Sequence, residues 1–467
     1  MTHEVELTLD DGTALDTWDE YVVTLSVTEP GAAFTFAMWY SETRQATWSV
    51  LRSRVKAMRS VELAIDGAPQ LNGRIERIET SANGHGERAM VISGRDLAGP
   101  ALDWDVDPSL NVGGLTLETA LGRIFATVGI PVRVTTADAA RELTTKRKGS
   151  TATEAAASST PRGGLSESLR RALREAANLP WASGSTNAGV ERVLVRRDET
   201  EPTIEGVAAI TPPTRERRRA RARAKAVKDI VIPIAHPRPG ERVWSFAESI
   251  VSRIGARMWV APDPERGLCV VVDTPESSGP AVFAFVRRIV NGVTDPRSNI
   301  LSGTESISTR EVPTTVVVYT GTDRGDKISS RGRTVVENGP LSTRETTRGM
   351  VADDPPPQPR HVRSTRARTI ARASQEGTRI ITDAMAGFRT YTVTVRGHSQ
   401  SLDGTPRLYG INCIARVYDD VCTDPDGNAL DEDMLITRVV FRRSRQGGTT
   451  TELTLLPLGA LLSEPDV

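Results

Sequence analysis

Short apolar runs rich in β-forming residues, separated by turns, recur through the first hundred positions, a pattern typical of consecutive strands. In Val61–Gly67, the large apolar residues Val61, Leu63 and Ile65 share one face, and an Asp-Gly pair ends the run. Gly-rich turns recur at short intervals along this part of the chain. The pattern predicts an antiparallel β-sandwich or β-barrel over residues 1–105.

Beyond residue 105 the apolar period becomes that of a helix. Apolar stripes with helical spacing cover 117–128, 165–176 and 243–254. The last stripe precedes two short apolar runs, 258–260 and 268–272, which predict a hairpin. Residues 106–290 are therefore expected to form an α/β region built from helices and hairpins.

The remaining pattern divides the chain further. Residues 136–235 are rich in Thr, Ser, Ala and Gly, a composition typical of a poorly ordered insert. We expect strands over 291–347, a Pro-rich linker over 348–363, a helix over 364–386, and a second β region over 387–467. The fold class is then α+β and mainly β.

Composition argues against several classes of protein. Lys and Arg total 59, and Asp and Glu also total 59, so no overall charge attracts nucleic acid or a membrane surface. Three cysteines in no metal-binding spacing argue against a disulfide scaffold and a zinc ribbon. The acidic, strand-like start resembles no signal peptide, and no apolar run is long enough for a membrane span. Synthesis in a cytoplasm and no membrane partner are expected.

The chain carries no recognisable catalytic motif. Its five histidines lie far apart in sequence, and it contains no G-x-S-x-G turn and no Walker lysine. We expect a non-enzyme with no catalytic residue, no cofactor and no metal. Residues 419–433 form an acidic segment, which is either an acidic hairpin loop or a calcium-binding loop. Counting from Asp424, its glycine falls at the fourth place and Leu435 at the twelfth, which is not the spacing of an EF-hand. The spacing therefore favours the acidic hairpin loop.

Two charged stretches have more than one interpretation. An Arg-rich run over 215–225 is either a solvated helix or loop, which we favour, or a basic contact with phosphates, a lumen or a partner. The arginines concerned are Arg217, Arg218, Arg219, Arg221 and Arg223. Gly94-Arg95-Asp96 follows an apolar strand and is either a cradle for an anion or a plain strand end with its turn.

The order of the β and α segments resembles the baseplate hub proteins of contractile phage tails, particularly the Mu-like family. The stretches that carry the resemblance are Val5-Glu6-Leu7, Asp10-Asp11-Gly12, Trp18, Phe34-Thr35-Phe36, Val61–Gly67, Gly73-Arg74-Ile75, Ser93–Leu97 with Leu102-Asp103, Pro239–Trp244 with Ile254-Gly255, Ser298–Leu301, and Tyr391–Leu458. Together they cover most of the chain outside about 136–235, which has no counterpart in the family pattern.

This resemblance implies two similar antiparallel β-barrels of the hub type in each subunit, with the helix-hairpin regions between them. It also implies a homotrimer that joins a sixfold tail tube to a threefold spike and lines a channel for genome delivery. The implied partners are the tail tube protein, the central spike protein, other baseplate proteins, and transiently DNA or a tape-measure protein. The implied location is the tail baseplate of a virion, after synthesis in a host bacterial cytoplasm.

In that setting Gly94, Arg95 and Asp96 become a structural turn or interface at the end of a barrel strand. Gly94 would adopt an unusual backbone angle, a local or intersubunit ion pair would fix the turn, and Pro100 would stop the strand. Two other functions remain as alternatives. One is a tail-associated cell-wall hydrolase, and the other is a spike or effector carrier of a related contractile secretion machine.

Overall fold

The computed structural model describes residues 3–82, 88–134, 236–252, 256–263, 267–320, 333–337, 358–364, 370–402, 405–423 and 428–461. The predicted insert, the helix expected over 165–176 and the five arginines between 217 and 223 lie outside these residues. What was expected for these residues therefore remains a prediction.

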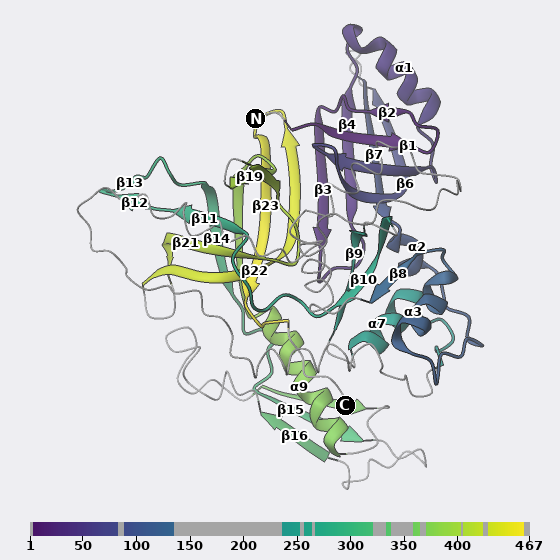
Figure 1. Ribbon diagram of the computed structural model, residues 1–467, viewed down its shortest axis with the longest axis vertical. Helices are drawn as coiled ribbons and strands as arrows, with labels where there is room; N and C mark the ends of the chain where they lie inside the picture. Colours follow the sequence, from purple (N-terminus) through teal and green to yellow (C-terminus); the bar gives the residue numbers. More distant parts are fainter. Residues whose placement is uncertain are drawn as a thin grey trace, which may run out of the picture.

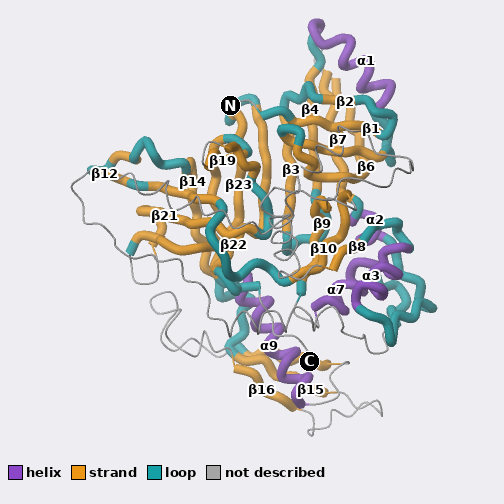
Figure 2. Tube along the Cα trace, viewed as in Figure 1, coloured by secondary structure: helices purple, strands orange, loops and turns teal. Residues whose placement is uncertain are grey.

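The dominant feature is one sheet of thirteen strands that runs across the molecule (Figures 1 and 2). Its N-terminal half consists of β1 (Val5–Leu9), β2 (Ala14–Leu15), β3 (Glu20–Ser26), β4 (Ala33–Trp39), β5 (Ser60–Ile65), β6 (Ala68–Ala82) and β7 (Arg88–Asp96). Its C-terminal half consists of β11 (Phe283–Arg287), β14 (Ile300–Ile307), β18 (Arg389–Arg396), β21 (Cys413–Thr423), β22 (Ala429–Ser444) and β23 (Gly448–Pro457).

The two halves repeat one strand order. The N-terminal order is β3-β4-β7-β6-β5-β1, and the C-terminal order is β14-β18-β23-β22-β21-β11. In each half the middle strand of a three-strand meander is long. Its register against the third strand of the meander shifts once, between Ile75 and Arg77 in β6 and between Ile436 and Arg438 in β22. One pairing differs, because β1 is antiparallel to β5 whereas β11 is parallel to β21.

The halves are joined by a pairing that we call the seam. Up to its register shift β22 pairs with β21, and beyond it Arg438–Arg443 pairs antiparallel with Tyr21–Ser26 of β3. The backbone N–H of Val27 extends this ladder by donating to the carbonyl oxygen of Thr437 over 2.8 Å. The first and last parts of the chain therefore share one continuous sheet.

Mainly antiparallel β structure is confirmed, but the two expected barrels are not closed. A barrel needs hydrogen bonds between its first and last strands. In the N-terminal half the outer edge of β3 is already occupied by β22, so β3 cannot pair with β1. In the C-terminal half, Asn299 links β11 to the start of β14. Its backbone N–H donates to the carbonyl oxygen of Val286, its Oδ1 accepts the backbone N–H of Val286, and its Nδ2 donates to the carbonyl oxygen of Ala284.

Strict alternation of apolar residues explains why these strands build one core. In β1 the pattern places Val5, Leu7 and Leu9 inside, and in β5 it places Val61, Leu63 and Ile65 inside. The apolar side chains of both halves belong to one contiguous cluster. Burial of this surface is the main source of stability, at about 25 cal/mol for each Å² of apolar area removed from water.

Two small units lie beside the sheet (Figure 1). The first packs α2 (Ala98–Asp103), α3 (Leu117–Ala126) and α7 (Val243–Val251) with a sheet of β8 (Val132–Val134), β9 (Arg257–Asp263) and β10 (Gly267–Asp273) around its own core. The second packs α9 (Ile370–Ala386) on β15 (Thr315–Thr320), β16 (Arg333–Glu337) and β17 (Pro359–Ser364). It is inserted between β14 and β18 of the C-terminal half.

The other elements are short. They are η1 (Glu42–Arg44), α1 (Gln45–Arg54), the hairpin of β12 (Ile289–Val290) and β13 (Val293–Thr294), and the hairpin of β19 (Ser399–Leu402) and β20 (Thr405–Leu408). In the described ranges, no helix has the combination of length and hydropathy that a membrane crossing requires.

Two of the three predicted helical stripes lie in the described residues, and both are confirmed. The stripes over 117–128 and 243–254 form α3 and α7, and the runs over 258–260 and 268–272 form the paired strands β9 and β10. The helix expected over 364–386 is described from Ile370, whereas Ser364 ends β17. Residues of the segment predicted as a linker also contribute to β17, because Pro359–Ser364 pairs with β15.

Candidate functional site

A polar cluster crosses the inside of the seam. From the N-terminal half come His3, Asp66 and Tyr21, and from the C-terminal half come His398 and Thr451. The rings of His3 and His398, 395 residues apart in sequence, have centroids 4.8 Å apart. His398 and Thr451 are fully buried, and Tyr21 is nearly so. The cluster is therefore a structural joint between the halves.

The hydrogen bonds of this joint fix the proton positions. The backbone N–H of His398 donates to Nε2 of His3, so His3 carries its proton on Nδ1 and donates it to Asp66 at 2.6 Å. The Thr451 hydroxyl donates to the carbonyl of Gly397 and therefore accepts from Nδ1 of His398. Nε2 of His398 is then left to accept from the Tyr21 hydroxyl at 2.8 Å. Both imidazoles are neutral in this arrangement.

The electrostatics agree with a neutral His398 ring. Burial lowers the pKa of His398 to about 3. Burial also raises the pKa of Tyr21 to about 12. Although burial opposes it, the hydrogen bonds from His3 and from the backbone of Glu4 lower the pKa of Asp66. Neutral rings and an ionised Asp66 suit a fixed contact better than proton transfer.

The Gly-Arg-Asp segment lies at the end of β7, as expected, and its polar side chains bond within the chain. Arg95 forms ion pairs with Glu76 at 2.8 Å and with Asp103 of α2 at 2.5 Å. Asp96 is 2% exposed and accepts the backbone N–H groups of Ala32 and Ala98, each at 2.9 Å. Burial raises the pKa of Asp96 to about 6. The segment thereby ties β4, β7 and α2 together.

Two details of that segment differ from expectation. The backbone of Gly94 does not have a positive φ. The glycine is needed because a Cβ there would lie 1.9 Å from the carbonyl oxygen of Arg74 on β6 and 2.7 Å from the Phe34 ring. Pro100 does not stop the strand, since β7 ends at Asp96 and Pro100 lies inside α2.

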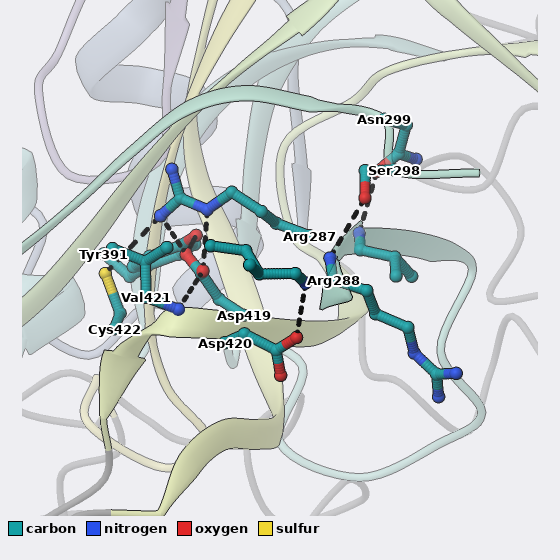
Figure 3. A network of polar contacts seen from close by, with 11 residues as sticks. Arg287, Arg288, Ser298, Asn299, Tyr391, Asp419, Asp420, Val421 and Cys422 are labelled. Atoms are coloured by element: carbon teal, nitrogen blue, oxygen red, sulfur yellow. Dashed lines mark hydrogen bonds and ion pairs between the residues drawn. The ribbon is translucent and has the colours of Figure 1, made fainter. Parts of the chain in front are cut away.

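A second buried network occupies the C-terminal half (Figure 3). Arg287 of β11 contacts Asp419 of β21 through both Nε and Nη2, at 2.7 and 2.6 Å. The Tyr391 hydroxyl donates to the same carboxylate at 2.6 Å, and the backbone N–H of Val421 donates to it at 2.9 Å. Despite its burial, which acts in the opposite direction, these donors lower the pKa of Asp419. The charge is thus fully hydrogen-bonded inside the protein.

The acidic segment 419–433 is spread over two paired strands rather than gathered around an ion. Asp420 accepts the backbone N–H of Ile289 at 2.7 Å, and Asp431 and Asp433 form ion pairs with Arg416. Residues 424–427 lie outside the described residues. Among those described, no group of His, Cys, Asp or Glu could hold a metal ion.

The cysteines are free thiols: Cys269 and Cys413 are buried, and Cys422 is half-buried. Burial raises the pKa of the Cys413 thiol, which makes it unreactive. Sequence reasoning found the Gly-Arg-Asp segment but missed the joint and the Arg287–Asp419 pair. Neither has a local signal, since their members lie far apart in the chain.

Comparison with solved structures places this fold among known proteins. No protein-family model matches the sequence, and no curated protein matches it. Solved structures do match. A tail protein from Neisseria meningitidis MC58 has 18% identity and a TM-score of 0.62, with all of both chains covered. The 43 kDa tail protein of prophage MuSo2 from Shewanella oneidensis has 15% identity and a TM-score of 0.60, with 98% of this chain and 99% of that chain covered. The chain thus shares the fold of these two tail proteins along nearly its whole length.

Proposed function

We propose that this protein is the structural baseplate hub of a contractile phage-type tail. Three copies would form a ring that adapts the sixfold tail tube to the threefold spike and lines the channel through which the genome passes. The observation that carries the proposal is the strand order shared by the two halves of the sheet. The likeness to two tail proteins over whole chains supports it.

Duplication inside the chain gives a physical reason for this role. A homotrimer offers only threefold symmetry, and a sixfold tube needs six similar contacts. Two similar halves in each of three copies supply six similar surfaces around one axis. Cyclic homo-oligomers with closed symmetry are common among soluble proteins, so a closed trimer is an ordinary assembly.

The proposed partners follow from this position. The ring would contact the tail tube protein on one side, the central spike protein on the other and further baseplate proteins at its rim. Contact with DNA or a tape-measure protein would be transient, during passage through the channel. The protein would act in the virion tail after synthesis in the host bacterial cytoplasm, as an architectural component and not as an enzyme.

The mass of the purified chain in solution tests the proposal. Light scattering should give three times the mass of one chain, and two-dimensional class averages should display a ring with six similar lobes. A stable monomer or a twofold dimer would contradict the proposed role. A zymogram on bacterial cell wall is the companion measurement, and clear lysis by the purified chain would favour the hydrolase instead.

A further inference from the structure

We infer that copies of this chain join head to tail by strand pairing, with residues 77–82 of β6 lying antiparallel to residues 303–308 of β14 in the next copy. The inference rests on the proposed trimer and deepens it by naming the contact and its register. It is derived from the repeated strand order within one chain, and the occupant of both surfaces is a second copy of the same chain.

Each position in one half of the sheet has an equivalent position in the other half. Aligning the register shifts of β6 and β22 makes Arg77 equivalent to Arg438 and Thr80 equivalent to Phe441. Following the ladders outward through β7 and β23, and then β4 and β18, makes Phe34 equivalent to Tyr391. One strand further, Val23 of β3 is equivalent to Glu305 of β14.

In each equivalent pair, one member is used in a strand ladder, and the other has no ladder on the corresponding side among the described strands. Beyond its register shift β22 pairs with β3 to form the seam. The equivalent part of β6, residues 77–82, pairs only with β7 among the described strands, and nearly all of its side chains are exposed. Likewise β3 is used in the seam, whereas β14 pairs only with β18 in the described part of the sheet.

These two free strands cannot satisfy each other within one chain. Figure 1 shows β14 and β6 on opposite sides of the sheet, with β3 and the seam between them. A head-to-tail contact with another copy does bring them together, and it repeats the geometry of the seam. Free strand edges are templates for further pairing, and a closed ring leaves none of them exposed.

The seam also predicts the register between copies. Within the chain Phe441 lies opposite Val23, and Arg442 lies opposite Val22. By equivalence, Thr80 should lie opposite Glu305 of the next copy, and Ser81 opposite Thr304 of the next copy. Ile78 would then meet Ile307 of the next copy, a side chain that is 40% exposed in the single chain.

Backbone directions agree with this register. The bond from Val27 to Thr437 points the backbone groups of Thr437 at β3, and alternation beyond it points those of Val439 and Phe441 the same way. Ile78 and Thr80 therefore direct their N–H and C=O groups to the free side of β6. On β14 the backbone N–H of Glu305 bonds to the sulfur of Cys422, a weak acceptor that an incoming carbonyl oxygen would replace.

Cysteine cross-linking of the full chain tests the register. Ser81 and Thr304 would form a non-hydrogen-bonded pair, with Cα atoms about 4.5 Å apart, which suits a disulfide. The double variant Ser81→Cys/Thr304→Cys should give covalent dimers and trimers on mild oxidation, which disappear on reduction. The matched control is Val22→Cys/Arg442→Cys at the equivalent pair of the seam, which should link within one chain and give no oligomer.

An off-register variant, Ser81→Cys/Ser306→Cys, should cross-link at least tenfold less. Equal cross-linking of both variants would overturn the register. If light scattering finds a trimer and the seam control forms its disulfide, but Ser81→Cys/Thr304→Cys stays unlinked, the strand pairing is wrong and the trimer stands. A chain that remains monomeric at every concentration would overturn the pairing and the proposed function together.

A backbone substitution gives a second readout. Thr80→Pro removes an N–H that faces the free side of β6 and leaves the N–H groups that face β7 in place. The variant should remain folded by circular dichroism and lose association at least tenfold, whereas Thr80→Val should associate as the parent chain does. Undiminished association of a folded Thr80→Pro variant would contradict strand pairing at β6.

Discussion

The two halves of the sheet share a strand order and differ in where they bury polar side chains. In the C-terminal half, Arg287 on β11 faces Asp419 on β21. The equivalent neighbours in the N-terminal half are Val5 on β1 and Ile65 on β5, both buried. One half thus places a buried ion pair where the other places an apolar pair.

The difference accompanies the change in strand direction. The apolar pair belongs to the antiparallel strands β1 and β5, and the ion pair belongs to β11 and β21, which are parallel. Buried ion pairs add little net stability over apolar residues of similar size, but their geometry is specific. The bond from Arg287 to Asp419 adds a directional contact to the register that the buried side chains Phe283 and Phe285 of β11 already favour.

At the ends of β7 and β23 the polar residues lie in the N-terminal half and the apolar residues in the C-terminal half. Arg95 and Asp96 end β7, and the equivalent residues of β23 are Leu456 and Pro457. Leu456 is buried, whereas Arg95 makes ion pairs near the surface with Glu76 and Asp103. The polar end of β7 adjoins α2 and the first small unit, so the charged side chains serve a connection that β23 does not make.

The largest effect is expected from Asp419→Ala. The substitution leaves the Arg287 guanidinium and the Tyr391 hydroxyl buried without their acceptor, which should cost about 3–5 kcal/mol in the free energy of unfolding. Chemical denaturation of the parent and the variant measures this cost. The double variant Arg287→Leu/Asp419→Leu imitates the N-terminal half and should be less destabilised than Asp419→Ala. A double variant that loses as much as the sum of both single variants would refute the comparison.

Ile65→Ala is the counterpart in the N-terminal half. It opens a cavity beside Val5 and should lower the free energy of unfolding by about 2–4 kcal/mol. Because no charge is involved, the loss should not change between low and high salt. Ile65→Val is the control and should cost about 1 kcal/mol. A marked salt dependence for Ile65→Ala would show that the two positions differ in more than polarity.

Asp96 gives a smaller effect with a defined dependence on pH. Its pKa is about 6 in the fold and near 3.8 when unfolded, so the fold favours the protonated form. The stability that this group contributes is complete below about pH 4 and is lost as the pH rises to about 6. Asp96→Asn should abolish this part of the pH dependence. At neutral pH it should cost about 1–2 kcal/mol, because an amide cannot accept both backbone N–H groups. An unchanged pH profile in the variant would contradict this assignment.

Arg95→Ala should have the smallest effect on stability, about 0.5–1 kcal/mol, because its ion pairs are partly exposed. Arg95→Lys keeps the charge, loses the planar fork and should fall in between. Light scattering of the same variants separates the two roles proposed for this residue. A folded Arg95→Ala chain that assembles normally marks a local turn, and a folded chain that fails to assemble marks an interface.

Much of the local structure was predictable from the sequence. The alternation of Val61, Leu63 and Ile65 gave β5, and helical stripes gave α3 and α7, because these elements each bury one face. The end of β7 at Asp96 was also predictable. The role of Gly94 was not, since a close approach of the backbone of β6 leaves no mark in the local pattern.

The contacts between distant segments lay beyond sequence reasoning. The pairing of β22 with β3 joins residues more than 400 positions apart, and its choice depends on which strand edges remain free after each half has folded. His3 and His398 meet only because of that pairing. Closed barrels were expected because nothing in the sequence of β3 indicates that its outer edge pairs with β22.

Equivalence of the two halves around a common axis is the central claim, and a symmetry-resolved image of the purified assembly tests it most directly. The account predicts three copies with six similar sheets around one axis, and a contact between copies at β6 and β14 that repeats the seam. A ring in which the N-terminal and C-terminal halves occupy dissimilar positions, or a particle with no threefold axis, would contradict it.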